Sequence, residues 1–349
     1  MSKLELETLV HEGSLVSGLD FGGADLSGAD LGGAVFERVS FRNANLRGAV
    51  LKESTFSECD FSEADLSDAQ LGRALLHRCN AEGASFRQAS LAGCNLNECD
   101  LTAAAFSGAD LTLVPFSKVR LNGAFFDGAT MLRTAFIDSE VHGIDLRGSD
   151  LEQTVLYRCD LREAKLEGAR FNTTLLIEAN LAGHSFRGVS MRLCQLMGAD
   201  VSGCDFSDAD LAQINFTGAD LQGAILKNVS APTALFVEAK LDGADFTGAS
   251  LAQSIFVDAK ASGASFNQAN MQQCIMHRAD CSRSRFEGTD LTYADFSHAT
   301  LQQSLFSTNK MFRTVLHQVD DAGAHYSNRA QALGDDPDKK EAEQWEAKF

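Results

Sequence analysis

Apolar residues recur at every fifth position of this chain, without a break, from Phe21 to Leu316. All sixty of these positions hold Leu, Phe, Met, Val, Ala or Cys, although only 44% of the chain is hydrophobic. A spacing of five fits neither the period of a helix nor the alternation of a strand. Short fixed periods are typical of solenoids, so the sequence predicts one continuous repeat structure instead of several globular domains.

The residues around each central position, called i here, follow a pattern of their own. Position i−2 is small, position i−1 is often Asp or Asn, and positions i+1 and i+2 are polar or Gly. Two inward side chains in every five residues describe a chain that turns a corner in each pentapeptide. Clean copies of the pattern are Ala24-Asp25-Leu26-Ser27-Gly28, Ala64-Asp65-Leu66-Ser67-Asp68, Ala109-Asp110-Leu111 and Ala219-Asp220-Leu221-Gln222-Gly223.

This pattern resembles that of the pentapeptide repeat family, Ala-(Asp/Asn)-Leu-x-x, over about 300 of the 349 residues. The resemblance implies an all-β fold, a right-handed quadrilateral β-helix with four pentapeptides per coil and about fifteen coils. The distribution of Phe supports four faces independently, because central Phe residues concentrate on two faces that lie opposite each other in a square. An interior filled by layers of facing side chains favours that arrangement.

The ends of the chain depart from the repeat. We expect residues 1–18 to form an N-terminal cap, residues 19–318 the solenoid, and residues 319–349 a C-terminal cap or helical tail. Within the tail, Ser327–Leu333 and Lys339–Phe349 could form short helices, the second of which holds Trp345, the one Trp. Capping of the last coil, a dimer contact and a partner-binding tail all remain open from the sequence.

The nine Cys residues are expected to point inward as small apolar side chains. Cys281 occupies a central position, and the other eight lie at i−2, namely Cys59, Cys79, Cys94, Cys99, Cys159, Cys194, Cys204 and Cys274. A reduced, cytoplasmic protein is expected, because no signal peptide or apolar run of transmembrane length is found.

The sequence contains no motif of an enzyme, so a catalytic activity and a cofactor are not expected. The Cys residues show no zinc-binding spacing with His. His77, His277 and His317 lie several coils apart, which predicts that they do not share a metal ion, and no metal site is expected. His184 occupies a small inward slot and is interpreted as a packed core residue.

One outer face is predicted to bind a partner or a second copy of the chain. Ten of its fifteen i−1 residues are apolar, and its i+2 positions alternate in charge from Arg38 and Glu58 to Arg158 and Glu178. The preference of branched residues for extended walls is the alternative explanation. Replacing Tyr157 or Ile177 by Asp should abolish association without unfolding the chain. The candidate partner-binding residues are Ile137, Val155, Tyr157, Leu175, Ile177, Met197, Leu235, Val237, Ile255, Val257 and Trp345.

The net charge of −18 suggests a second function. The resemblance implies that some family members imitate DNA and bind bacterial type II topoisomerases such as gyrase. However, eighteen of the acids are Asp at i−1, which the repeat itself prefers. Direct nucleic-acid binding is not expected without clustered Lys, Arg and aromatic residues. The first hypothesis is therefore a non-catalytic bacterial interaction scaffold that uses the apolar face and the C-terminal segment, beside a secretion system or effector as the resemblance implies. The alternative is a DNA-mimicking modulator of a type II topoisomerase.

Overall fold

The computed structural model describes residues 2–345 and shows a parallel β-solenoid of about 16 turns. Residues in successive turns pair at intervals of 20, as in the bridges Asp20↔Ser40 and Leu235↔Ile255. This register confirms four pentapeptides per turn. Pairing already includes Leu15 and still includes Tyr326, which agrees with the expected number of about fifteen coils.

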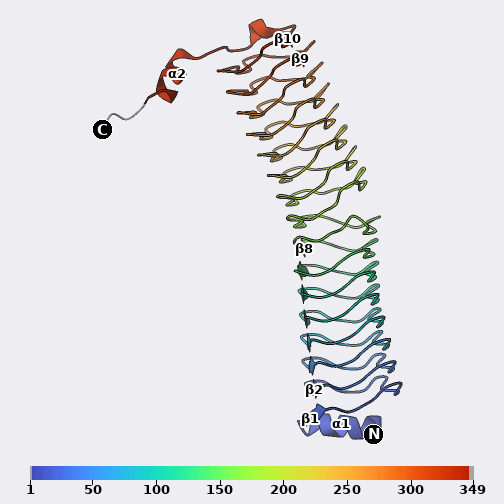
Figure 1. Cartoon of the computed structure of the whole chain (residues 1–349). Coiled ribbons are helices and arrows are strands. Elements are labelled where there is room, and N and C mark those ends of the chain that lie inside the picture. Colours follow the sequence, from blue (N-terminus) through green and yellow to red (C-terminus); the bar gives the residue numbers. More distant parts are fainter. Residues whose placement is uncertain (1, 346–349) are drawn as a thin grey trace. The chain divides into compact units, whose positions relative to one another are not determined.

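The chain divides into two compact units, Met1–Asn180 and Leu181–Phe349. In the first unit one wall is a parallel eight-stranded sheet in chain order. Figure 1 shows its turns stacked one above the next. The strands are β1 (Leu15–Ser17), β2 (Val35–Glu37), β3 (Thr55–Ser57), β4 (Leu75–His77), β5 (Asn95–Asn97), β6 (Pro115–Ser117), β7 (Ala135–Ile137) and β8 (Val155–Leu156).

In the second unit the same repeat is joined mostly by isolated parallel bridges, such as Leu235↔Ile255 and Ile255↔Ile275. Strands β9 (Leu305–Phe306) and β10 (His325–Tyr326) pair near its end. The described residues contain no helix long and apolar enough to cross a membrane. The predicted division into cap, solenoid and tail stays a prediction.

The corners explain the polar part of the repeat. Residue i+2 adopts a positive φ in nearly every pentapeptide, which favours Gly, for example Gly23 at 65°. Non-glycine residues also occupy this position, including Leu113 at 61°. The Asp at i−1 accepts a hydrogen bond from the backbone N–H of residue i+1, as Asp60 does from Ser62 at 2.9 Å. The Asp therefore closes the turn that its own repeat makes.

The core consists of the central residues stacked from turn to turn. Phe116 and Phe136 stack at 4.9 Å with rings 5° apart, and so do Phe106 and Phe126 at 4.9 Å and 6°. Rings of the two opposite walls meet edge to face, for example Phe116 and Phe126 at 5.9 Å. The concentration of Phe on two opposite faces thus produces two ring columns in contact.

The nine cysteines are all free and buried, as the sequence predicted. Several of them also donate a hydrogen bond to a carbonyl of the preceding turn. Cys204 donates to the Leu181 carbonyl at 3.1 Å, and Cys274 to the Leu251 carbonyl at 2.9 Å. Thr134 makes the same contact with Leu111 at 2.6 Å. The i−2 slot therefore accepts any small side chain that is apolar or carries such a donor.

Helix α1 (Lys3–His11) covers the first turn. Ser2 and Glu5 form a capping box at its N-terminus. Leu6 and Val10 are buried, and the backbone N–H of Asp30 donates to Glu7 at 3.0 Å. The helix therefore lies against the open edge of the first turn, through its buried side chains and the hydrogen bond from Asp30 to Glu7.

The C-terminal segment contains the 3-10 helix η1 (Arg329–Gln331) and helix α2 (Pro337–Glu343). The first expected helix is thus shorter than residues 327–333, and the second begins earlier than Lys339. Trp345 lies beyond α2 instead of within it, and residues 346–349 of the expected helix lie outside the described residues. The α2 start has a physical cause, because Asp336 caps the backbone N–H groups of Asp338 and Lys339.

Candidate functional site

The apolar face of the sequence is the outer side of one solenoid wall, called here the aliphatic wall. It comprises the i−1 and i+1 residues around the central positions from Val16 to Leu316 in steps of 20. In the first unit this wall is the β1–β8 sheet, continued by the bridge Val155↔Leu175. The branched residues therefore suit an extended wall, which accounts for part of the pattern.

The structure places the candidate residues of the first unit on adjoining turns. Val155 pairs with Ala135 of β7 and with Leu175 of the next turn, so the i−1 residues form a column. Ile137, Tyr157 and Ile177 occupy the i+1 position of the same three turns. These candidates belong to one continuous surface.

The candidates of the second unit occupy the same wall positions. Leu235 pairs with Ile255, and Ile255 pairs with Ile275. Val237 and Val257 are the i+1 residues of the Leu235 and Ile255 turns, and Met197 is the i+1 residue of the Gln195 turn; all three are half-buried. The three successive turns from Leu235 to Ile275 form the longest apolar i−1 column of this wall in the second unit.

Exposure differs from what residue type alone suggests. Among the candidates, Ile137 is 40% exposed and Trp345 is 75% exposed, whereas the other nine are half-buried by their neighbours in adjoining turns. Four further apolar side chains, at and beside corners, are more exposed than Ile137, and sequence reasoning missed them. The signal that could have identified them is a Leu or Tyr at i+2, or a Phe at i+1, where the repeat usually has a polar residue. These are Leu113, Leu193, Tyr293 and Phe312.

The alternating charges beside the wall form ion pairs only in places. Arg78 pairs with Glu98 at 2.9 Å, and Arg158 pairs with Glu178 at 2.7 Å. Arg38 instead contacts the adjacent Glu37 at 2.7 Å. The Arg158 guanidinium also lies 4.8 Å from the centre of the Tyr157 ring, so this candidate is covered partly by a cation.

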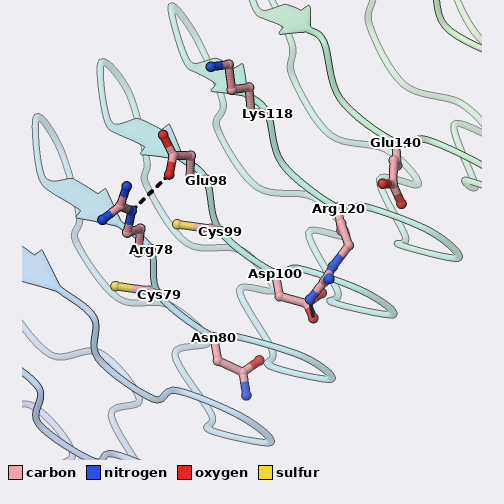
Figure 2. Close-up of a pocket in the computed structure, with 9 residues that line it drawn as sticks. All are labelled: Arg78, Cys79, Asn80, Glu98, Cys99, Asp100, Lys118, Arg120 and Glu140. Carbon is pink, nitrogen blue, oxygen red and sulfur yellow. Dashed lines mark hydrogen bonds and ion pairs between the residues drawn. The ribbon is translucent and has the colours of Figure 1, made fainter.

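A depression of about 500 Å³ lies at the corner beside this charge row, in the first unit (Figure 2). It contains the Arg78–Glu98 pair and a second ion pair between Arg120 and Asp100. Burial alone would raise the pKa of Asp100, but hydrogen bonds from Arg120 and Thr102 outweigh it and lower the pKa. Two of the three acids that line the depression, Glu98 and Asp100, are thus held by arginines, and the third, Glu140, accepts from the Asn122 side chain at 3.1 Å.

The acidic rows are engaged in the fold in the same way. Besides closing its turn, an i−1 Asp often binds a base one turn away, as Asp220 does Lys240 at 3.1 Å and Asp290 does Lys310 at 3.1 Å. Burial would raise the pKa of Asp290, but hydrogen bonds from Thr292, Gln272 and Lys310 lower it to about 2. These carboxylates are bound within the chain, which limits how far they can imitate a phosphate backbone.

The structure also assembles three side chains that sequence reasoning did not connect. His298 and His317 lie on successive turns of the second unit, and both contact Glu343 at the end of α2 at 3.2 Å. The five-residue spacing relates His317 only to His77 and His277, which also lie at i+1 on the aliphatic wall. His184, interpreted as a core residue, is half-buried beside Phe186, at a ring distance of 6.0 Å.

A parallel solenoid that completes one turn in every four pentapeptides defines a class of protein, the pentapeptide β-solenoids. The family model for pentapeptide repeats (8 copies) matches residues 116–153, 154–192, 194–230, 239–278 and 276–307. The model for a pentapeptide repeat region matches residues 29–106 and 49–126. The chain belongs to the pentapeptide repeat family.

Solved structures of the same family resemble this chain. A trypsin-treated variant of QnrB1, a plasmid-mediated fluoroquinolone resistance protein, is 28% identical with a TM-score of 0.38, covering 54% of this chain and 83% of that one. HetL, involved in heterocyst differentiation regulation in the cyanobacterium Nostoc sp. strain PCC 7120, is 21% identical with a TM-score of 0.25, covering 86% and 97%. No curated protein matches this chain.

Proposed function

We propose that this protein is a non-catalytic interaction scaffold that binds another protein surface through the aliphatic wall of its first unit. One observation carries this proposal: Val155, Leu175 and the neighbouring i+1 residues form an outward column of apolar side chains on adjoining turns. Strand preference explains their branched shape, but not the exposure of Ile137 to solvent. A contiguous apolar surface is typical of an interface.

The charges beside this column suggest the form of the partner. Arg78, Glu98, Arg158 and Glu178 alternate in sign along the chain, and within one copy they form the pairs Arg78–Glu98 and Arg158–Glu178. A second copy running antiparallel presents acids opposite bases and apolar residues opposite apolar residues, so the surface is self-complementary in chemistry. Self-association is therefore the first property to measure.

A cytoplasmic location of the protein remains a prediction.

The test compares two valines that occupy the same i−1 position on different walls. Val155 lies on the aliphatic wall and Val50 on another wall of the same unit, and Asp is compatible with the i−1 position elsewhere in the chain. We expect Val155→Asp to reduce the oligomer mass measured by light scattering, and Val50→Asp to leave it unchanged. Circular dichroism of both variants checks that they are folded.

A photo-cross-linker placed at position 137 or at position 50 extends the test to partners in the native host. Products specific to position 137 are expected. A monomeric parent protein, together with equal products from both positions, would contradict the proposal.

A gyrase supercoiling assay tests the alternative function. Inhibition of supercoiling that survives Val155→Asp would favour topoisomerase binding through the acidic rows.

A further inference from the structure

Glu343 is held between two histidines from successive turns of the second unit. His298 Nε2 lies 3.2 Å from Glu343 Oε1, and His317 Nε2 lies 3.2 Å from Oε2. The three ligand atoms all lie within 4.8 Å of one another. We propose that His298, His317 and Glu343 form a binding site for a divalent transition-metal ion of the zinc type, which fastens α2 to the solenoid.

The donor set and its spacing support this assignment. Two imidazoles and one carboxylate are a common zinc-binding set that leaves a fourth position open. Ligands about 2.0–2.1 Å from a tetrahedral ion lie roughly 3.3 Å from each other. The His298–Glu343 and His317–Glu343 separations of 3.2 Å are close to this value, although they run to the two different oxygens of the carboxylate. Closing the cluster onto an ion requires one Glu343 oxygen and the two imidazole nitrogens, which lie within 4.8 Å of one another, to approach each other.

The surroundings of His317 determine how it would bind the ion. Its side chain is fully buried, and the backbone N–H of Asp336 donates to its Nδ1 at 3.1 Å. In that state Nε2 carries the hydrogen and donates it to Glu343. Metal binding at Nε2 requires this hydrogen to move to Nδ1, and the backbone N–H of Asp336 must then turn away from Nδ1. The Asp335 carboxylate lies 4.0 Å from Nδ1 and accepts the backbone N–H of Gln318 at 2.8 Å, so it must approach to accept the new hydrogen. A carboxylate behind a ligating histidine is the usual support, so Asp335 is a positioning residue.

The fourth position has a nearby donor from the protein. The side-chain amide nitrogen of Gln318 lies 2.9 Å from Glu343 Oε2. Rotation of this amide presents its oxygen to the same place.

A bound ion has a definite consequence for the C-terminal segment. Helix α2 buries none of its own residues, so polar contacts such as those of Glu343 and Lys339 hold it against the wall. An ion shared by Glu343 and two histidines of the solenoid adds a link between the helix and two turns. Metal binding and attachment of α2 are therefore coupled.

The experiment uses the untagged full-length chain after treatment with a chelator. Titration with Co²⁺ should produce the visible absorption of a tetrahedral site at one ion per chain, and Zn²⁺ should displace it. We expect His298→Gln and Glu343→Gln each to weaken Zn²⁺ binding by about tenfold or more, and Asp335→Asn to weaken it by about tenfold. Circular dichroism confirms that each variant is folded.

His142 supplies the matched control. It pairs with a carboxylate, that of Glu163, at 2.9 Å, but it does not belong to the group of three possible metal ligands found among the described residues. His142→Gln should leave Zn²⁺ binding unchanged. Zn²⁺ should also slow amide exchange in residues 335–343 of the parent but not of Glu343→Gln. Absence of stoichiometric binding, unchanged affinity in His298→Gln and Glu343→Gln, or exchange in α2 that ignores Zn²⁺ would each overturn the proposal.

Discussion

Asp290 accepts two hydrogen bonds from Thr292, one from the backbone N–H at 3.1 Å and one from the hydroxyl at 2.7 Å. The same double contact joins Asp245 to Thr247 at 3.0 and 2.6 Å. The acidic residue of the repeat is thus a structural group that closes a corner. Much of the negative charge of this chain follows from the geometry of its turns.

The low pKa of Asp290 predicts a pH-dependent contribution to stability. Because the folded-state pKa of about 2 lies below the usual value for Asp, the contribution is present above pH 4 and is lost as the pH falls through 2. With its side chain only 15% exposed, Asp290→Asn should cost about 2 kcal/mol at pH 6. Urea unfolding of the variant and the parent at a series of pH values measures this difference.

The exposed Glu238 provides the control, since Glu238→Gln should change the unfolding free energy little. For Asp290→Asn, the difference from the parent should shrink toward pH 2. A constant difference over this range would contradict the role of the Asp290 charge.

Adjacent phenylalanines allow the core and the surface to be compared directly. Phe126 is fully buried and stacks on Phe106 at 4.9 Å, whereas Phe125 points outward and is 39% exposed. We expect Phe126→Ala to cost about 3–5 kcal/mol, because it leaves a cavity in the ring column. Phe125→Ala should cost about 1 kcal/mol or less. Chemical unfolding monitored by circular dichroism measures both, and equal losses would contradict the assigned orientations.

The sequence was sufficient to predict the wall positions because a period of five is read directly from the chain. The central residues, the inward cysteines and the opposite Phe columns all follow from that spacing. The exposure of the candidate residues was less predictable. Val155 and Leu175 point outward but are shielded by their neighbours in adjoining turns, which residue type does not show.

The ends could be predicted less well because the repeat no longer applies there. Val315 pairs with Leu333, so part of the C-terminal segment adds to the wall in a register different from the five-residue spacing. Glu343 then reaches His298 and His317, which are 45 and 26 residues earlier in the chain. No local pattern brings these three residues together; only the path of the chain after Tyr326 does.

The cysteines should be protected from thiol reagents until the solenoid unfolds. Burial raises the pKa of Cys94, Cys159, Cys204 and Cys274 to about 12, so little thiolate is present at neutral pH. Mass spectrometry after alkylation at pH 8 should find these four unmodified in the folded protein and modified in urea. Labelling of these four without unfolding would contradict their burial.

Asn309 is an unusual occupant of the i−2 position, which otherwise holds mostly small side chains. Its Nδ2 donates to the Phe286 carbonyl, but its Oδ1 is buried without a hydrogen-bond partner in the described part of the chain. One turn earlier, Thr289 occupies the same position and donates to the Phe266 carbonyl at 2.7 Å. Thr therefore supplies the donor without the unpaired acceptor.

We expect Asn309→Thr to raise the unfolding free energy by about 1 kcal/mol, because an unpaired buried acceptor costs roughly 1–3 kcal/mol. The reverse change one turn away, Thr289→Asn, should lower the unfolding free energy by a similar amount. Thermal and urea unfolding of the two variants beside the parent measure both effects. A loss of stability in Asn309→Thr would mean that the amide oxygen is satisfied in solution, for instance by an ordered water.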